Sequence, residues 1–299
     1  MATLYDVAES NIRKTFLLIS IFLLMIIFLG WILSYLFRTT ILLWIAVIYS
    51  ILMSFFSYWY SDKIVLRMTK AKPVTREGNP ELYRIVENLC ITAGLPVPKI
   101  YILDEKQPNA FATGRDPNHA AIVFTKGLLE KLDKLEIEGV ASHELSHIKN
   151  RDILLGSVVV VLAGVIALVS DWVLRVTFWG GESREEKGSG GIILLLLIII
   201  SVILAPLAAT LIRLAVSRKR EFLADASGAL LTRYPEGLAR ALEKIAADKT
   251  PMKVASNSTA HLFISSPFKG KSSGHWFARL FMTHPPVEER IKMLRSMDI

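Results

Sequence analysis

The stretch Ser142-His-Glu-Leu-Ser-His-Ile-Lys-Asn-Arg-Asp152 contains the pattern HExxH, with His143, Glu144 and His147 at its fixed positions. On a helix, residues four positions apart share a face, so both imidazoles can reach one zinc ion. Glu144 then lies beside the open position of the metal, where it can accept a proton from water. The stretch therefore predicts a helical zinc site that contains its own general base.

The predicted helix begins near Asp133, because Asp133 followed by Glu136 is a typical N-terminal capping pair. From Lys134 the chain runs without proline into an apolar block, so we expect one continuous helix. The polar residues 149–152 separate His147 from that block. This separation favours a site outside the lipid and argues against an intramembrane protease.

A catalytic zinc site needs a third ligand, and Glu221 is the best candidate in the sequence. Glu221 follows one apolar block by about eight residues, and His147 precedes another by about six. At about 1.5 Å per residue, both would stand roughly 10 Å outside a bilayer on two helices of one hairpin. Asp225, one turn beyond Glu221, could accept the outer N–H of His143 and fix its tautomer. The alternative is that Glu221 and Asp225 form a solvated face balancing the basic residues 218–220.

Four apolar blocks of membrane-spanning length stand out in this chain of 299 residues, of which 52% are hydrophobic and 21% charged. The mean hydropathy is +0.43, which excludes a disordered chain and disfavours an ordinary soluble domain. The blocks are residues 16–37, 41–60, 153–174 and 192–214. The first is too long for a cleavable signal, so we expect it to remain as an anchor. For the last two, a pair of long buried helices in a soluble protein is the alternative.

The blocks divide the chain into four parts. Residues 1–60 contain the first hairpin and residues 153–214 the second, while 61–152 and 215–299 would together form one catalytic domain. Basic residues gather before and after the first hairpin, whereas its far turn carries only Arg38, so both termini and the catalytic domain should face the cytoplasm. The same basic residues account for the net charge of +8, and no nucleic-acid motif accompanies them. We therefore expect no nucleic-acid partner.

Three short strands are predicted in the first soluble part, at Lys99–Leu103, Ala110–Gly114 and 120–124. The single cysteine, Cys90, cannot form an intrachain disulfide and is interpreted as a buried apolar residue. The remaining histidines are interpreted as surface or turn residues, with His261 also a candidate accessory group at the mouth of the site. These histidines are His119, His261 and His275.

Together with three further segments, the HExxH stretch resembles the HtpX-like membrane zinc metalloproteases. The segments are Asn109-Ala-Phe-Ala-Thr-Gly114, Glu221-Phe-Leu-Ala-Asp225 and Thr283-His-Pro-Pro-Val-Glu-Glu-Arg290. They occur in order over nearly the whole chain, together with the four apolar blocks. The resemblance implies that His143, His147 and Glu221 bind one zinc ion per chain and that Glu144 is the general base.

The resemblance also implies roles that spacing cannot show. The segment that begins at Asn109 resembles an edge strand along which an extended substrate pairs through its backbone. The substrate-binding candidates are therefore Asn109, Ala110, Phe111 and Ala112. His284 is expected near the developing oxyanion, with Arg290 supporting its loop and helping to bind substrate. The alternative for His284, which precedes two prolines, is an ordinary turn residue.

The expected fold is a mainly α integral membrane protein with four transmembrane helices and a cytoplasmic α+β zincin-type domain containing a three-stranded sheet. The expected activity is zinc-dependent hydrolysis of unfolded or damaged membrane proteins at a prokaryotic cytoplasmic membrane. The resemblance implies a part in quality control and stress response, with the lipid bilayer and other quality-control proteins as possible partners.

Three alternatives remain open. A protease of the related CAAX group would process lipidated peptides, although four apolar blocks rather than about seven favour the HtpX-like reading. A non-catalytic membrane scaffold could hold a structural zinc ion, but such a site has no use for Glu144. A transporter or channel would need ionisable groups within its spans, and the blocks contain only Asp171 and Arg213.

Overall fold

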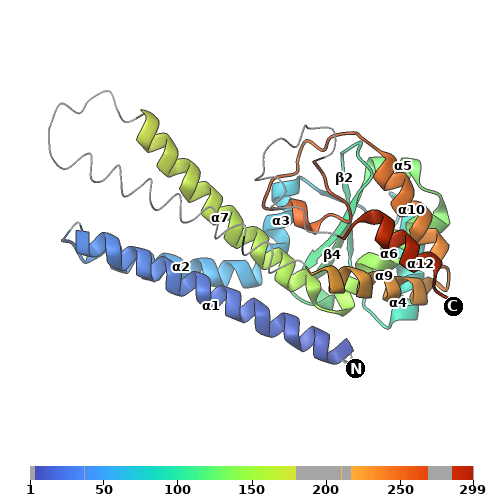
Figure 1. Ribbon diagram of the computed structural model, residues 1–299, viewed down its shortest axis with the longest axis horizontal. Helices are drawn as coiled ribbons and strands as arrows, with labels where there is room; N and C mark the ends of the chain where they lie inside the picture. The colour runs from blue at the N-terminus through green and yellow to red at the C-terminus, as the bar shows by residue number, and fades with distance from the viewer. Residues whose placement is uncertain (1–3, 37, 180–209, 211–216, 269–284, 299) are drawn as a thin grey trace.

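Two long apolar helices form a hairpin at the N-terminal end of the computed structural model (Figure 1). They are α1 (Leu4–Leu36) and α2 (Ile41–Trp59). The structure describes residues 4–36, 38–179, 210, 217–268 and 285–298. Within the hairpin, Ala8–Tyr35 and Ile41–Trp59 are long and apolar enough to cross a membrane, and their large side chains are widely exposed, as lipid-facing side chains would be. The first two apolar blocks are thus confirmed as candidate spans.

The third apolar block lies on α7 (Asp152–Trp179), which follows the HExxH helix α6 (Lys134–Lys149). The axes of the two helices differ by 83°, and Arg151 between them has a positive φ of 59°. The expectation of one continuous helix is therefore wrong. Counted together, α6 and the first part of α7 give a third candidate span. The fourth block, 192–214, lies outside the described residues except for residue 210.

A mixed sheet of four strands lies in the domain beside these helices, in the order β1-β2-β4-β3. Its strands are β1 (Lys72–Pro73), β2 (Lys99–Leu103), β3 (Ala110–Gly114) and β4 (Ala120–Thr125). β4 pairs in parallel with β2 and antiparallel with β3. The three predicted strands are confirmed, but the three-stranded sheet is corrected to four, because β1 has two residues, one of them proline, and gives no alternation signal.

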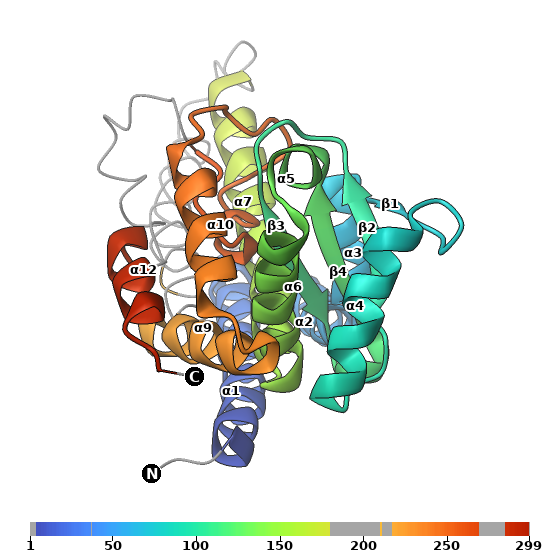
Figure 2. The same cartoon turned by 90° about the vertical axis from the view of Figure 1, so that its right-hand side faces the viewer.

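Three helices pack directly on α6: α4 (Pro80–Ala93), α9 (Arg218–Thr232) and α10 (Pro235–Ala247). Of the others, α12 (Val287–Arg295) packs on α9 and α10, α3 (Ser61–Thr69) on α7 and β3, and α5 (Lys126–Lys131) on β4. The short 3-10 turns are η1 (Pro117–His119) and η3 (Ala260–Leu262). In Figure 2, α6 crosses the front of the sheet, with α4 on one side and α9 and α10 on the other. The two soluble parts of the chain, before and after the second apolar hairpin, thus pack into one body.

The position of α6 is fixed by its cap and by two close glycine contacts. The predicted capping pair is confirmed: the Asp133 carboxylate accepts from the Glu136 N–H, and the Glu136 carboxylate accepts from the Asp133 N–H. A Cβ on Gly139 would lie 2.6 Å from the Leu238 nitrogen in α10. A Cβ on Gly228 of α9 would lie 3.0 Å from the His143 nitrogen. Both neighbouring helices can therefore approach the backbone of α6 closely.

Candidate metal centre

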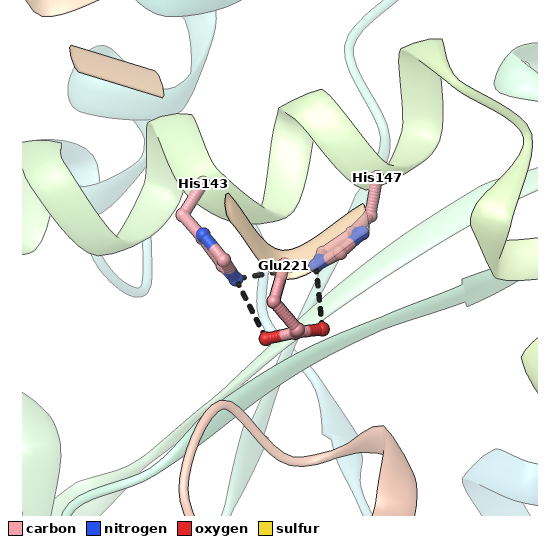
Figure 3. A group of neighbouring side chains, drawn as sticks. All are labelled: His143, His147 and Glu221. Atoms are coloured by element: carbon pink, nitrogen blue, oxygen red, sulfur yellow. Dashed lines mark hydrogen bonds and ion pairs between the residues drawn. The ribbon is translucent and has the colours of Figure 1, made fainter. Parts of the chain in front are cut away.

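His143 and His147 project from α6 toward the carboxylate of Glu221, which comes from α9 (Figure 3). The two Nε2 atoms are 3.1 Å apart. Glu221 Oε2 lies 3.9 Å from His143 Nε2, and Glu221 Oε1 lies 3.6 Å from His147 Nε2. One ligand atom from each residue lies within 4.8 Å of the others. Two helices far apart in sequence thus bring three metal-binding side chains to one point.

Each histidine meets a carboxylate through its outer nitrogen. His143 Nδ1 lies 2.9 Å from Asp225 Oδ1, and His147 Nδ1 lies 2.9 Å from Asp152 Oδ2. A carboxylate in this position holds the proton on Nδ1 and leaves the Nε2 lone pair for a metal. Two imidazole nitrogens and one carboxylate oxygen are the donor set of many catalytic zinc sites. The residues present therefore fit a zinc ion.

Asp225 is held in turn by Arg290 on α12, and both side chains have no exposed surface. Arg290 donates from Nε to Asp225 Oδ2 at 2.8 Å and from a terminal nitrogen to Oδ1 at 2.7 Å. Its other terminal nitrogen donates to the Ile264 carbonyl and lies 3.7 Å from Glu221. Burial opposes ionisation of Asp225, but Arg290 and His143 hold its pKa at about 2. Asp225 is thus a fixed negative charge behind His143.

Glu144 is buried beside the three ligands, with only 2% of its surface exposed. The pKa of Glu144 is raised to about 7, chiefly by burial and also by the neighbouring Glu221 carboxylate, while His147 and a hydrogen bond from the Ala112 backbone oppose the rise. A carboxyl group with a pKa near neutrality can both accept and return a proton.

The electrostatics of His147 show that the site favours a positive charge. Burial lowers the pKa of His147, but Asp152, Glu221 and Glu144 outweigh it and raise the pKa to about 9. The acidic groups thus stabilise one positive charge at His147, whereas burial lowers the pKa of His143. A bound metal ion would supply that charge.

A small cavity of about 50 Å³ opens onto this site. Its lining includes Ala112, Glu144, His147, Glu221 and His261. His261 lies on η3 and is 6% exposed, with its Nε2 3.3 Å from the Gly156 carbonyl. The surface interpretation of His261 is therefore wrong, whereas the turn and the place at the mouth of the site agree with the structure.

The segment predicted to bind an extended substrate forms β3, which is an edge strand of the sheet. Part of that edge is already covered: the Ala110 carbonyl accepts from the Ile264 N–H, and the Asn109 side chain bonds both backbone groups of Ser265. Phe111 is buried against Phe263. Ala112 is the member of the segment that lines the cavity. The substrate-binding role of the four residues stays a prediction.

Other candidates lie in different settings. His284 and His275 are outside the described residues. Arg290 is fully buried and contacts Asp225, the carboxylate that faces His143. Its predicted contact with substrate stays a prediction. His119 lies in the turn η1, where Asp116 and Arg115 contact it, as the turn interpretation expects. Cys90 is buried on α4, as predicted.

Sequence reasoning missed the role of Asp152, which it treated only as part of a polar spacer. Asp152 opens α7 and faces back toward His147 because of the sharp bend between the two helices. An acidic residue in the first turn of a helix was the available signal. The bend that gives this residue its second contact was not foreseen.

Known proteins resemble this chain in both sequence and fold. The profile of Peptidase family M48 matches residues 76–298. A "Protease HtpX homolog" of Thermoanaerobacter pseudethanolicus is 47% identical over 303 residues, covering 99% of each chain. Another, from Thermococcus sibiricus, is 47% identical over 257 residues, covering 84% of this chain and 85% of its own.

Among solved structures, that of S. mikatae Ste24p aligns with a TM-score of 0.50 at 19% identity, covering 97% of this chain and 67% of that one. This likeness supports the fold. The family match, and the 47% identity over nearly the full length of an HtpX homologue, also identify the type of enzyme. Both agree with the His-His-Glu centre of the structure and the buried glutamate beside it. The chain belongs to peptidase family M48 and is a metallopeptidase homologous to HtpX.

Proposed function

We propose that this chain is a zinc-dependent endopeptidase that cleaves unfolded or damaged membrane proteins on the cytoplasmic side of a prokaryotic membrane. The observation that carries the proposal is the direction of the two Nε2 atoms, which face Glu221 while each Nδ1 atom lies 2.9 Å from a carboxylate oxygen. The general base Glu144 lines the same cavity as two of the ligands. This arrangement is suited to hydrolysis rather than to a purely structural metal site.

The residues divide the work of hydrolysis between them. His143, His147 and Glu221 would hold one zinc ion, which supplies Lewis-acid chemistry by lowering the pKa of water and polarising a peptide carbonyl. Glu144 accepts a proton from the attacking water and later gives it to the leaving amine. Water attacks directly, so no covalent bond forms between the chain and its substrate. Burial raises the pKa of Glu144 above that of an exposed glutamate, which helps it to hold the proton between the two transfers.

The surroundings of the site favour a membrane-associated substrate. α7 begins five residues after His147, and its first half packs against α1 through Leu18 and Phe22. The cavity therefore opens close to apolar helices of spanning length, two of them candidate spans by themselves. We infer four spans in all, with both termini and the catalytic domain in the cytoplasm, because basic residues flank the first hairpin on one side.

The edge position of β3 further favours an unfolded substrate. An extended chain could pair beside Ala112, but it would compete with the Ile264 N–H for the Ala110 carbonyl. A segment without stable structure of its own pays the entropy of becoming ordered, but it can adopt such a strand without first having to unfold. We therefore place the enzyme in the quality control of membrane proteins during stress, with the bilayer and other quality-control proteins as partners.

Substrate competition in lipid vesicles tests this proposal. The purified full chain is given a membrane protein with an unfolded cytoplasmic loop, its folded counterpart and an isoprenylated peptide. We expect cleavage of the unfolded loop, loss of cleavage with a zinc chelator, and little cleavage of the other two. Preference for the isoprenylated peptide would identify a lipidated-peptide protease instead. Zinc binding without cleavage of any substrate would favour a scaffold.

A further inference from the structure

A buried chain of polar contacts connects the first membrane helix to the metal ligand His147. Asn11 on α1 is 1% exposed, and its side-chain amide donates to Asp152 Oδ1 at 2.6 Å and to the Asn150 carbonyl at 3.0 Å. Its side-chain oxygen accepts from Arg220 at 3.0 Å. The other oxygen of Asp152 lies 2.9 Å from His147 Nδ1. Asn11 is thus one residue removed from a metal ligand, although 136 positions separate it from His147 in the sequence.

The chain of contacts joins three separate elements. Asn11 belongs to the candidate span Ala8–Tyr35, Asp152 lies at the bend between α6 and α7, and Arg220 comes from α9 immediately before the ligand Glu221. A polar side chain that is buried in protein is unfavourable unless it is paired. In Asn11 both the amide nitrogen and the oxygen are paired, and every partner lies next to the metal site or within it.

The two histidines receive parallel support. Asp225 holds His143 and is fixed by Arg290, so that arm lies wholly within the catalytic domain. Asp152 contacts His147 through one oxygen. Its other oxygen, Oδ1, accepts a hydrogen bond from Asn11 and lies 3.4 Å from Arg220 Nε. The second arm therefore depends on where α1 lies relative to the catalytic domain. A shift of α1 would break the hydrogen bond from Asn11 to Asp152 and loosen the orientation of His147.

We propose that Asn11 is a positioning residue for His147 and that it makes the first membrane helix a part of the metal site. The proposal rests on the zinc site of the proposed function, and it goes beyond that site by assigning a role to a residue outside the catalytic domain. Displacement of α1 should weaken metal binding and lower turnover. The opposite interpretation is that Asn11 only packs α1 against its neighbours.

Zinc affinity of the full chain distinguishes the two interpretations. The dissociation constant is measured by competition with a chelating dye for wild type, Asn11→Leu, Asn11→Asp and the control Thr15→Val. Thr15 is also buried and lies one turn further along α1, but its hydroxyl donates to the Asn11 backbone carbonyl within the helix. Asn11→Asp keeps the size of the side chain and an acceptor for Arg220 while placing a second carboxylate against Asp152, so it carries the test if the leucine variant does not fold.

We expect both Asn11 variants to bind zinc roughly tenfold more weakly, at the lower end of the range for residues that orient metal ligands. Their kcat should fall with little change in KM, and Thr15→Val should match wild type. In an Asp152→Asn background, Asn11→Leu should change the affinity by less than about twofold, because its route to His147 is already broken.

Two results would overturn the proposal while leaving the zinc site standing. One is an Asn11 variant that binds zinc as tightly as Thr15→Val. The other is an effect of Asn11→Leu that is equally large with and without Asp152→Asn, which would indicate a packing role alone. A wild-type chain that binds no zinc would instead refute the proposed function, and this inference with it.

Discussion

Replacement of Arg290 by methionine should strongly destabilise the catalytic domain. Methionine keeps an unbranched side chain but removes the charge that faces Asp225, whose side chain has no exposed surface. Removing one partner of a buried ion pair typically costs about 3–5 kcal/mol, because the other charge stays buried without compensation. The loss of the hydrogen bond to the Ile264 carbonyl acts in the same direction. A free-energy change of that size corresponds to a fall in Tm of roughly 6–20 °C.

The same helix supplies a matched control. Arg295 on α12 also bonds two carboxylates, those of Glu236 and Glu243, but its side chain is 44% exposed. Because water solvates those groups, Arg295→Met should lower the Tm by only a small fraction of the effect of Arg290→Met. Thermal unfolding of both detergent-purified variants, in the metal-free state, gives the comparison.

The pH dependence of the effect provides a second check. In the wild type the pKa of Asp225 is about 2, lower than in the unfolded chain, so the ion pair stabilises the fold above about pH 4. Without Arg290, burial should raise the pKa of Asp225, and a protonated carboxyl group is cheaper to bury. The Tm difference should therefore be larger at pH 8 than at pH 5. Equal Tm losses for Arg290→Met and Arg295→Met at both pH values would refute this reasoning.

Three further predictions concern the metal centre. The kcat/KM should fall as the pH decreases through an apparent pKa at or below about 7, because Glu144 must be ionised to accept a proton. A bound cation would lower the pKa of Glu144 further. A pH–rate profile that rises below pH 6 would contradict this prediction. Asp225→Asn should weaken zinc binding roughly 10–100-fold in a chelator competition, since the amide carries no charge behind His143. Gly228→Val should weaken zinc binding by forcing α9 away from α6, whereas Gly164→Ala, whose added Cβ would come no closer than 4.0 Å to the nearest atom, should bind zinc normally.

The local parts of the fold were predictable because their signals are local. The capping pair at Asp133 marks the start of α6, and short segments separated by Pro, Asn, Gly and Asp mark β2, β3 and β4. The helical spacing of His143 and His147 places both rings on one face, which the structure shows. These features depend on residues within a few positions of one another, where backbone geometry leaves few choices.

Glu221 does meet the histidines, but not because the two residues lie equally far outside a bilayer. That expectation assumed a straight helix from His147 into the membrane, whereas the chain bends by 83° between α6 and α7. What brings Glu221 to the histidines is the close packing of α9 on α6 at Gly228. A contact between two helices far apart in sequence depends on such tertiary packing, and no local pattern reports it.

The supporting residues were least accessible to sequence reasoning. In the sequence Asn11 is an ordinary polar residue before an apolar block, and the family resemblance gave Arg290 a different role, at the His284 loop and the substrate. Each becomes significant only because it is buried against a carboxylate that contacts a ligand histidine. Burial of a polar group is a property of the folded chain, so its partner cannot be inferred from sequence spacing alone.

The most direct test of the central claim compares wild type with Glu144→Gln, counting bound zinc and measuring hydrolysis of an unfolded protein in the same samples. Since Glu144 takes no part in the His-His-Glu donor set, the variant should retain one zinc ion per chain. Because it has lost its general base, its kcat should fall by a factor of roughly 100 or more. A Glu144→Gln variant that holds zinc and cleaves at the wild-type rate would contradict the account.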